Sequence, residues 1–255
     1  MIKERFSLIF SLFQAKIFAY TSSLLIFIAL LGMGVYVDSL NSENIYQDLR
    51  RSVHEQLSVI RAKLEGNINS NAQSIRGMVA AISTEPEMSL DRYAALSKPL
   101  FNKHSQLRNI AAAPDLVIRH MYPVKGNEAA IGLNYRNIPT QYKAVQKAIH
   151  IGELFISGPV NLVQGGKGFI ARMPVYIDSD KEAKDKLWGL VSAVIDTNAL
   201  YEASGFYNKN LNLEITIRGK DARGEKGQTF YGESDIYNFD PVNVDVVLPY
   251  GSWQL

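Results

Sequence analysis

The chain begins with a long apolar run. Residues 17–37, IFAYTSSLLIFIALLGMGVYV, contain no charged side chain. A helix over this run would be about 31 Å long at about 1.5 Å per residue, close to the thickness of a bilayer's hydrocarbon core. A secretory signal peptide is the alternative, but its apolar region is usually about 7–15 residues long and ends at a small-x-small site, which Gly32 and Gly34 provide poorly. The pattern favours a transmembrane helix, preceded by a short segment of residues 1–16.

Basic residues on the two sides of the apolar run indicate its orientation. Lys3, Arg5 and Lys16 precede the run, and Arg50 and Arg51 lie beyond it. Because Lys and Arg are more frequent on the cytoplasmic side of a membrane, this distribution favours a cytoplasmic N-terminus, although the two later arginines weaken the contrast. We therefore expect the remainder of the chain to be exported.

After the run, apolar positions recur at steps of three, four or seven and form one stripe along a helix. The stripe consists of Ile45, Leu49, Val53, Leu57, Ile60, Leu64, Ile68, Ile75, Val79 and Ile82. No proline occurs before Pro86, so a single stalk helix is predicted over residues 38–84. The stripe needs a cover, which is the protein's own domain, a second copy of the chain, or both at different heights. The steps depart from a strict heptad, which disfavours a pure coiled coil.

Beyond Pro86 the periodicity changes. Residues 89–205 have the pattern of a helix, two strands, a loop, a second helix and three strands, with a short helix after the last strand. The predicted N-caps are Ser89 for a helix over 90–104, Asn137 for a helix that ends at Gly152, and Thr197 for the short helix. This order predicts an α+β fold, in which helices pack on an antiparallel sheet.

A second block, residues 206–255, contains two alternating segments, LNLEITIRG and VNVDVVLPYG, that read as half-buried strands. The chain stops at GSWQL, within what still has the pattern of a strand. We therefore expect Leu255 to be an artificial or fragmentary end and this second module to be incomplete.

Composition narrows the function classes. Apolar residues make up 47% and charged residues 20% of the chain, and the formal charge of +2 comes from well-mixed signs. A nucleic-acid partner is therefore not expected, because such proteins usually carry a strongly basic face. The absence of cysteine excludes a disulfide framework and a thiol nucleophile. The four histidines have no metal-ligand spacing, so neither a metal nor a cofactor is expected.

Three features of the sequence are candidates for catalysis or for anion binding. The QGGKG segment lacks the P-loop spacing and precedes a strand, so a hairpin turn is favoured over an anion contact at Lys167. Ser157 lacks the flanking glycines of a nucleophile elbow, and no catalytic residue is predicted. Arg119 and Arg172 lie within apolar strand segments and need a partner, either an internal carboxylate, which is favoured, or an anion in a pocket.

Residues 107–177 resemble the CHASE family, the extracytoplasmic sensory domains of bacterial receptors and plant cytokinin receptors. The matching text is LRNIAAAPDLVIRHMYPVKGNEAAIGLNY and ISGPVNLVQGGKGFIARMPVYI. The resemblance implies a stalk helix followed by two PAS-like modules, a distal one at 89–205 and a proximal one at 206–255. It further implies a small-molecule ligand in the distal module, dimers that form through the stalk, and a cytoplasmic histidine kinase, diguanylate cyclase, phosphodiesterase or nucleotide cyclase that this chain does not contain.

The resemblance also suggests ligand-binding positions. Ser157 matches a small hydroxyl position of the pocket and Val163 an apolar wall position. A purine-anchoring Asp of the plant receptors falls near Gln141, and this difference speaks against a cytokinin ligand. Arg119 and Arg172 are the preferred polar groups of the pocket, on strands that face either the pocket or solvent. The full set of candidates is Ser157, Val163, Arg119, Tyr122, Gln141 and Arg172.

The sequence thus predicts the ligand-sensing region of a receptor in a bacterial inner membrane. The bilayer would hold residues 17–37, and residues 38–255 would be extracytoplasmic. Two alternatives remain open. The first is a membrane-anchored adaptor that binds a periplasmic protein. The second is a membrane-anchored enzyme, for which Asp115, His120 and Glu128 are the best available candidates.

Overall fold

The computed structural model describes residues 2–103, 105–162, 165–177 and 186–255, and the chain divides into two units, Met1–Ser52 and Val53–Leu255. Helix α1 (Ile2–Thr84) is unbroken, as the absence of proline predicted. Near its N-terminus the helix is apolar enough and long enough to cross a membrane, and its apolar stretch is not buried. A signal sequence near the N-terminus of a chain can pass the same test of length and composition.

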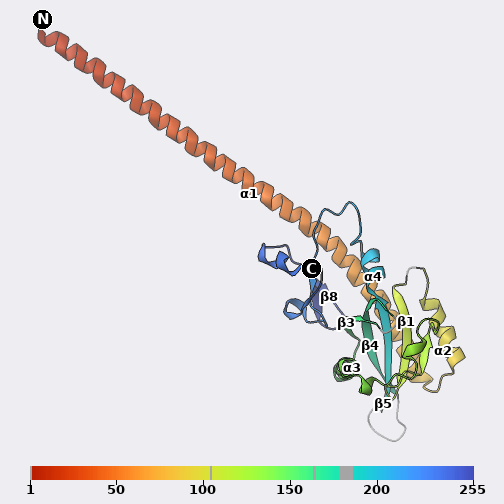
Figure 1. Ribbon diagram of the computed structural model, residues 1–255. Helices are drawn as coiled ribbons and strands as arrows, with labels where there is room; N and C mark the ends of the chain where they lie inside the picture. Colours follow the sequence, from red (N-terminus) through yellow and green to blue (C-terminus); the bar gives the residue numbers. More distant parts are fainter. Residues whose placement is uncertain (1, 104, 163–164, 178–185) are drawn as a thin grey trace. The chain divides into compact units, whose positions relative to one another are not determined.

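The second unit is built on a five-stranded antiparallel sheet with the order β2-β1-β5-β4-β3 (Figure 1). Its strands are β1 (Leu107–Pro114), β2 (His120–Tyr122), β3 (Phe155–Asn161), β4 (Lys167–Ile177) and β5 (Lys186–Asp196). The predicted hairpin between β3 and β4 is confirmed, because the two strands pair antiparallel. Gly165 and Gly166 adopt φ values of 84° and 77° in the connecting turn, which glycine adopts without strain.

One stripe of α1 belongs to the core of this unit. Leu64, Ile68 and Ile75 are completely or almost completely buried. Between Ile68 and Ile75 the stripe contains the polar residue Asn71, whose side chain donates a hydrogen bond of 2.9 Å to the side-chain oxygen of Gln106. The helix thus meets its own domain over residues 57–82, where that domain covers the stripe.

The other helices are α2 (Leu90–Ser97), α3 (Pro139–Ile151) and α4 (Thr197–Ser204), with 3-10 turns η1 (Lys98–Leu100), η2 (Glu128–Ala130), η3 (Tyr135–Asn137), η4 (Gly224–Lys226) and η5 (Ser234–Asn238). Ser89 caps α2 as predicted, but α2 ends at Ser97 because the chain tightens into a 3-10 turn at a proline. The predicted capping by Asn137 is wrong, since this residue ends η3. Asp196, one residue before the predicted cap, accepts the N–H of Ala199 at the start of α4.

A second sheet with the order β7-β6-β9-β8 follows along the chain. Its strands are β6 (Ile217–Arg218), β7 (Thr229–Tyr231), β8 (Asp245–Val247) and β9 (Ser252–Gln254). They are shorter than the two alternating segments suggested. Aromatic side chains join the two sheets, because the ring centroid of Phe169 in β4 lies 4.7 Å from that of Trp253 and 5.7 Å from that of Phe230.

Candidate functional site

A cavity of about 140 Å³ lies on one face of the five-stranded sheet. The segment from Ala130 to Ile138 and the first turn of α3 line its other side. Most of its walls are apolar. Its polar lining residues are Asn109, Tyr135, Gln141, Asn161, Arg172 and Ser192.

Strand alternation explains how the sheet presents this wall. Successive side chains of a strand point to opposite faces, and paired residues on neighbouring strands share a face. One such row crosses all five strands and consists of Phe155, Arg172, Ser192, Ala111 and Met121. Arg172 is the charged residue of this row. It lies near the middle of β4, where β4 pairs with β5.

Arg172 is buried, with 1% of its surface exposed. Its Nη1 donates to the hydroxyl of Ser157 at 2.6 Å, and its Nη2 donates to the side-chain oxygen of Gln141. Its Nε has no hydrogen-bond partner in the described part of the chain. Among the described residues, Arg172 forms no ion pair with a carboxylate. The internal carboxylate favoured from the sequence is therefore not found in the described part of the chain.

The charge of Arg172 makes this arrangement costly. Burial lowers the pKa of the guanidinium, with the nearby Tyr135 and the Asp221 carboxylate opposing that effect, but an arginine stays protonated in proteins. The Tyr135 ring centroid lies 5.9 Å from the guanidinium carbon, which offers a weak cation–π contact. The Asp221 carboxylate compensates the charge only in part, because the hydrogen-bond partners of Arg172 in the described chain are the neutral side chains of Ser157 and Gln141. An opposite charge bound directly to the guanidinium would therefore be favourable. The cavity can therefore bind an anionic group.

Further hydrogen bonds hold the polar wall in place. The Tyr135 hydroxyl lies 2.8 Å from that of Ser192, and the Asn109 side chain donates to Asn127 at 2.7 Å. Asn127 in turn donates to the backbone oxygen of Pro123. These residues were missed from the sequence. A weak signal existed, since Ser192 interrupts the apolar strand LWGLVSAVID with a polar side chain.

Three of the predicted site residues come together around the guanidinium. Gln141 reaches it from the first turn of α3, Ser157 from β3, and Arg172 itself comes from β4. The resemblance placed two of these positions in a pocket, but it did not indicate that they bond to the same arginine.

The other candidates lie elsewhere. Arg119 is exposed and does not line the cavity, because it precedes β2 in a turn where its backbone N–H bonds to Ala112. Tyr122 packs its ring against Phe101, with 5.2 Å between centroids, and is also absent from the cavity wall. Val163 lies outside the described residues.

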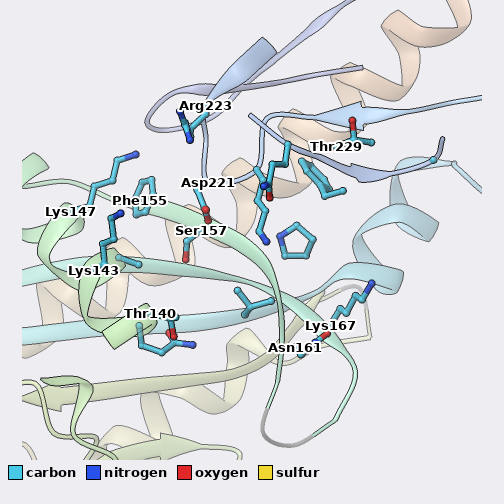
Figure 2. A pocket seen from close by; sticks show the side chains of 18 residues that line it. Thr140, Lys143, Lys147, Phe155, Ser157, Asn161, Lys167, Asp221, Arg223 and Thr229 are labelled. Atoms are coloured by element: carbon cyan, nitrogen blue, oxygen red, sulfur yellow. The ribbon is translucent and has the colours of Figure 1, made fainter. Parts of the chain in front are cut away.

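A second, open cleft of about 1140 Å³ lies between α3, β3 and the second sheet (Figure 2). Its lining is strongly cationic, with Lys143, Lys147, Lys167, Lys220 and Arg223. Asp221 is the acidic residue among the described lining residues, and its carboxylate accepts the N–H of Gly158 at 2.8 Å. Gln141 and Asn161 line both the cleft and the Arg172 cavity.

The fold defines a class of protein. It is similar to an extracellular ligand binding receptor from Desulfohalobium retbaense, with 15% identity and a TM-score of 0.60 over 78% of this chain, although the chain spans only 38% of that receptor's length. It is also similar to the sensory domain of the Campylobacter jejuni chemoreceptor Tlp3, with 12% identity and a TM-score of 0.54, covering 82% of this chain and 92% of the other. The same Tlp3 domain in complex with L-norvaline gives a TM-score of 0.53 at 10% identity, covering 82% and 89%. The architecture is that of extracellular sensory domains.

The family follows from the sequence. Residues 67–231, more than half of the chain, match the profile of the CHASE domain, and the chain belongs to this family. No curated protein matches the chain. Family membership and fold together support extracytoplasmic ligand sensing.

Proposed function

We propose that this chain is the sensing region of a bacterial inner-membrane receptor that recognises a small molecule in the Arg172 cavity. Residues 17–37 would cross the membrane, with residues 38–255 outside the cytoplasm. The observation that carries the proposal is a buried arginine that forms no ion pair with a carboxylate of the described residues and lies beside a small, mostly apolar cavity. Such cavities with a few convergent polar groups are the usual form of small-molecule sites.

The proposed binding residues are Arg172, Gln141 and Ser157. They lie in the segment 89–205, which we propose to be the distal PAS-like module, with residues 206–255 as the proximal one. The Tlp3 domain binds L-norvaline, a molecule of few atoms, and this supports a small-molecule ligand here. A cavity of about 140 Å³ suits a ligand somewhat smaller than L-norvaline.

We further propose that the receptor is a homodimer held by the stalk. Ile45 and Leu49 continue the apolar stripe but are 53% and 61% exposed, whereas Leu57 and Ile60 are buried. A second copy of the chain would cover the exposed part of the stripe. Ligand binding would shift the dimer between two geometries, provided that it binds one of them more tightly, and the stalk would pass this change to a cytoplasmic output domain.

A thermal-shift screen tests ligand sensing. The full chain in detergent micelles is screened against small metabolites, alongside the Arg172→Met variant. The expected result is one chemical class that raises the melting temperature of the wild type and leaves the variant unchanged. If no small molecule shifts the wild type, ligand sensing fails and binding of a periplasmic protein becomes the better explanation.

A further inference from the structure

The geometry points to a short-chain aliphatic monocarboxylate, of the size of propionate or butyrate, as the ligand of the Arg172 cavity. This inference rests on the proposed function, since it names the chemical class that the cavity would sense. The inference specifies three properties of the ligand, which are a net negative charge, a small size and a single polar end.

The guanidinium of Arg172 can donate further hydrogen bonds to a carboxylate. No described residue supplies an acceptor to the Nε of Arg172, and its Nη2 donates to the neutral amide oxygen of Gln141. A carboxylate bound to the edge formed by Nε and Nη2 would supply both acceptors in the bidentate geometry that arginine favours. It would displace Gln141 while leaving the 2.6 Å bond from Nη1 to Ser157 intact.

Charge balance distinguishes a carboxylate from an amino acid. None of the described residues that line the cavity is acidic. A monocarboxylate would neutralise Arg172, whereas a zwitterion would leave one uncompensated positive charge and bury an ammonium group without a carboxylate. Amino acids of the kind bound by the Tlp3 domain are therefore expected to bind weakly or not at all.

Size sets the length of the alkyl chain. An apolar cavity of about 150 Å³ in a protein core holds benzene, so a cavity of about 140 Å³ accommodates about six non-hydrogen atoms. Propionate and butyrate fall in this range. Their alkyl ends would meet the apolar walls formed by Ile118, Met121, Leu133, Ile170 and Val194. A dicarboxylate would place its second charge against these residues, which is unfavourable.

The test is a comparison of matched ligands on the full chain in detergent micelles. Calorimetric titration uses sodium propionate and butyrate, with propionamide as the neutral isostere, alanine and valine as zwitterions, and succinate as the dicarboxylate. Sodium chloride at equal ionic strength controls for a general anion effect. The carboxylates are expected to bind at least tenfold more tightly than each comparison compound.

Two variants locate the binding. Arg172→Met is expected to abolish carboxylate binding, and Val194→Phe to abolish it by filling the cavity while keeping the arginine. Arg119→Met, which changes an exposed arginine, should bind as the wild type does. Circular dichroism verifies that each variant is folded.

The outcomes separate the inference from the proposed function. Arg172-dependent binding of valine, succinate or propionamide at equal or higher affinity would overturn the monocarboxylate inference and keep ligand sensing. Carboxylate binding that survives both Arg172→Met and Val194→Phe would overturn the inference by placing the ligand elsewhere. If no compound binds here and the metabolite screen is also negative, both proposals fail.

Discussion

Gly158 and Asp221 hydrogen-bond to each other in both directions. The N–H of Gly158 in β3 donates to the Asp221 carboxylate at 2.8 Å, and the N–H of Asp221 donates to the Gly158 carbonyl at 3.4 Å. Gly158 directly follows Ser157, which accepts a hydrogen bond from Arg172. The strand that contacts the pocket arginine is therefore tied, one residue further on, to the connection between β6 and β7 of the second sheet.

Removing this tie should destabilise the domain. Asp221→Ala is expected to lower the free energy of unfolding by about 1–3 kcal/mol, because the N–H of Gly158 loses a charged acceptor. Asp221 has a φ of 60°, which Asn tolerates better than Ala, and Asn keeps an acceptor oxygen. Asp221→Asn should therefore cost less than Asp221→Ala. Urea unfolding followed by circular dichroism measures both, and equal losses would argue against the hydrogen bond as the cause.

Arg172 is expected to lower the stability of the ligand-free domain. Replacing a buried ion pair by apolar side chains of similar volume is often neutral or stabilising, by about 1–4 kcal/mol, and Arg172 lacks even an ion-pair partner among the described residues. We therefore predict that Arg172→Met unfolds at a higher urea concentration than the wild type when no ligand is present. Arg119→Met, at an exposed position, should change stability by less than about 0.5 kcal/mol. A clear loss of stability in Arg172→Met would show that the bonds to Ser157 and Gln141 outweigh the burial of charge.

The domain should lose stability on mild acidification through His120. Burial lowers the pKa of His120 below its ordinary value of 6.5, and the charge of Arg119 adds to this effect. The centroid of the His120 ring lies 5.2 Å from that of Tyr93, and its Nδ1 has no hydrogen-bond partner among the residues that the structure describes. Between the pKa of the unfolded chain, near 6.5, and the lower pKa of the folded chain, His120 binds a proton in the unfolded state but not in the folded state. The free energy of unfolding therefore falls as the pH drops through this window. His120→Gln should flatten this part of a stability–pH curve, and a slope unchanged by the substitution would assign it to other groups.

Trp253 should be the most sensitive aromatic position between the two sheets. It is 1% exposed, and its ring lies 4.7 Å from Phe169 and 5.3 Å from Phe230. Trp253→Ala should cost about 3–5 kcal/mol, since it opens a cavity. Trp253→Phe should cost clearly less, because it keeps a ring and removes an indole N–H that hydrogen-bonds to none of the described residues. Chemical unfolding checks the order, which would be contradicted if both variants lost equal stability.

Local patterns in the sequence were sufficient for the elements, but not for the site. The stripe of α1 and the absence of proline predicted the long helix, and the glycines near Lys167 predicted the β3–β4 hairpin. The end of α2 and the caps of α3 and α4 depend on single residues, and two of those caps were wrong. The surroundings of Arg172 could not be predicted from the sequence. Strand register and the placement of α3 bring Gln141, Ser157 and Ser192 next to it, and neither follows from a local pattern. No local pattern shows that the described chain supplies no carboxylate there.

The exposed part of the stalk stripe gives a final prediction. Burying a leucine side chain between two helices contributes about 1.5–3 kcal/mol, so placing a charge at Leu49 should weaken a stalk dimer at least tenfold. Val59 is a matched control, since it is 56% exposed on α1 but lies outside the stripe. Light scattering of the full chain in detergent micelles should show that Leu49→Lys shifts the dimer toward monomers and that Val59→Lys does not. Dimers that persist in Leu49→Lys would place the subunit contact outside the stripe, and the stalk would then have to transmit a signal without the helix pairing that its sequence suggests.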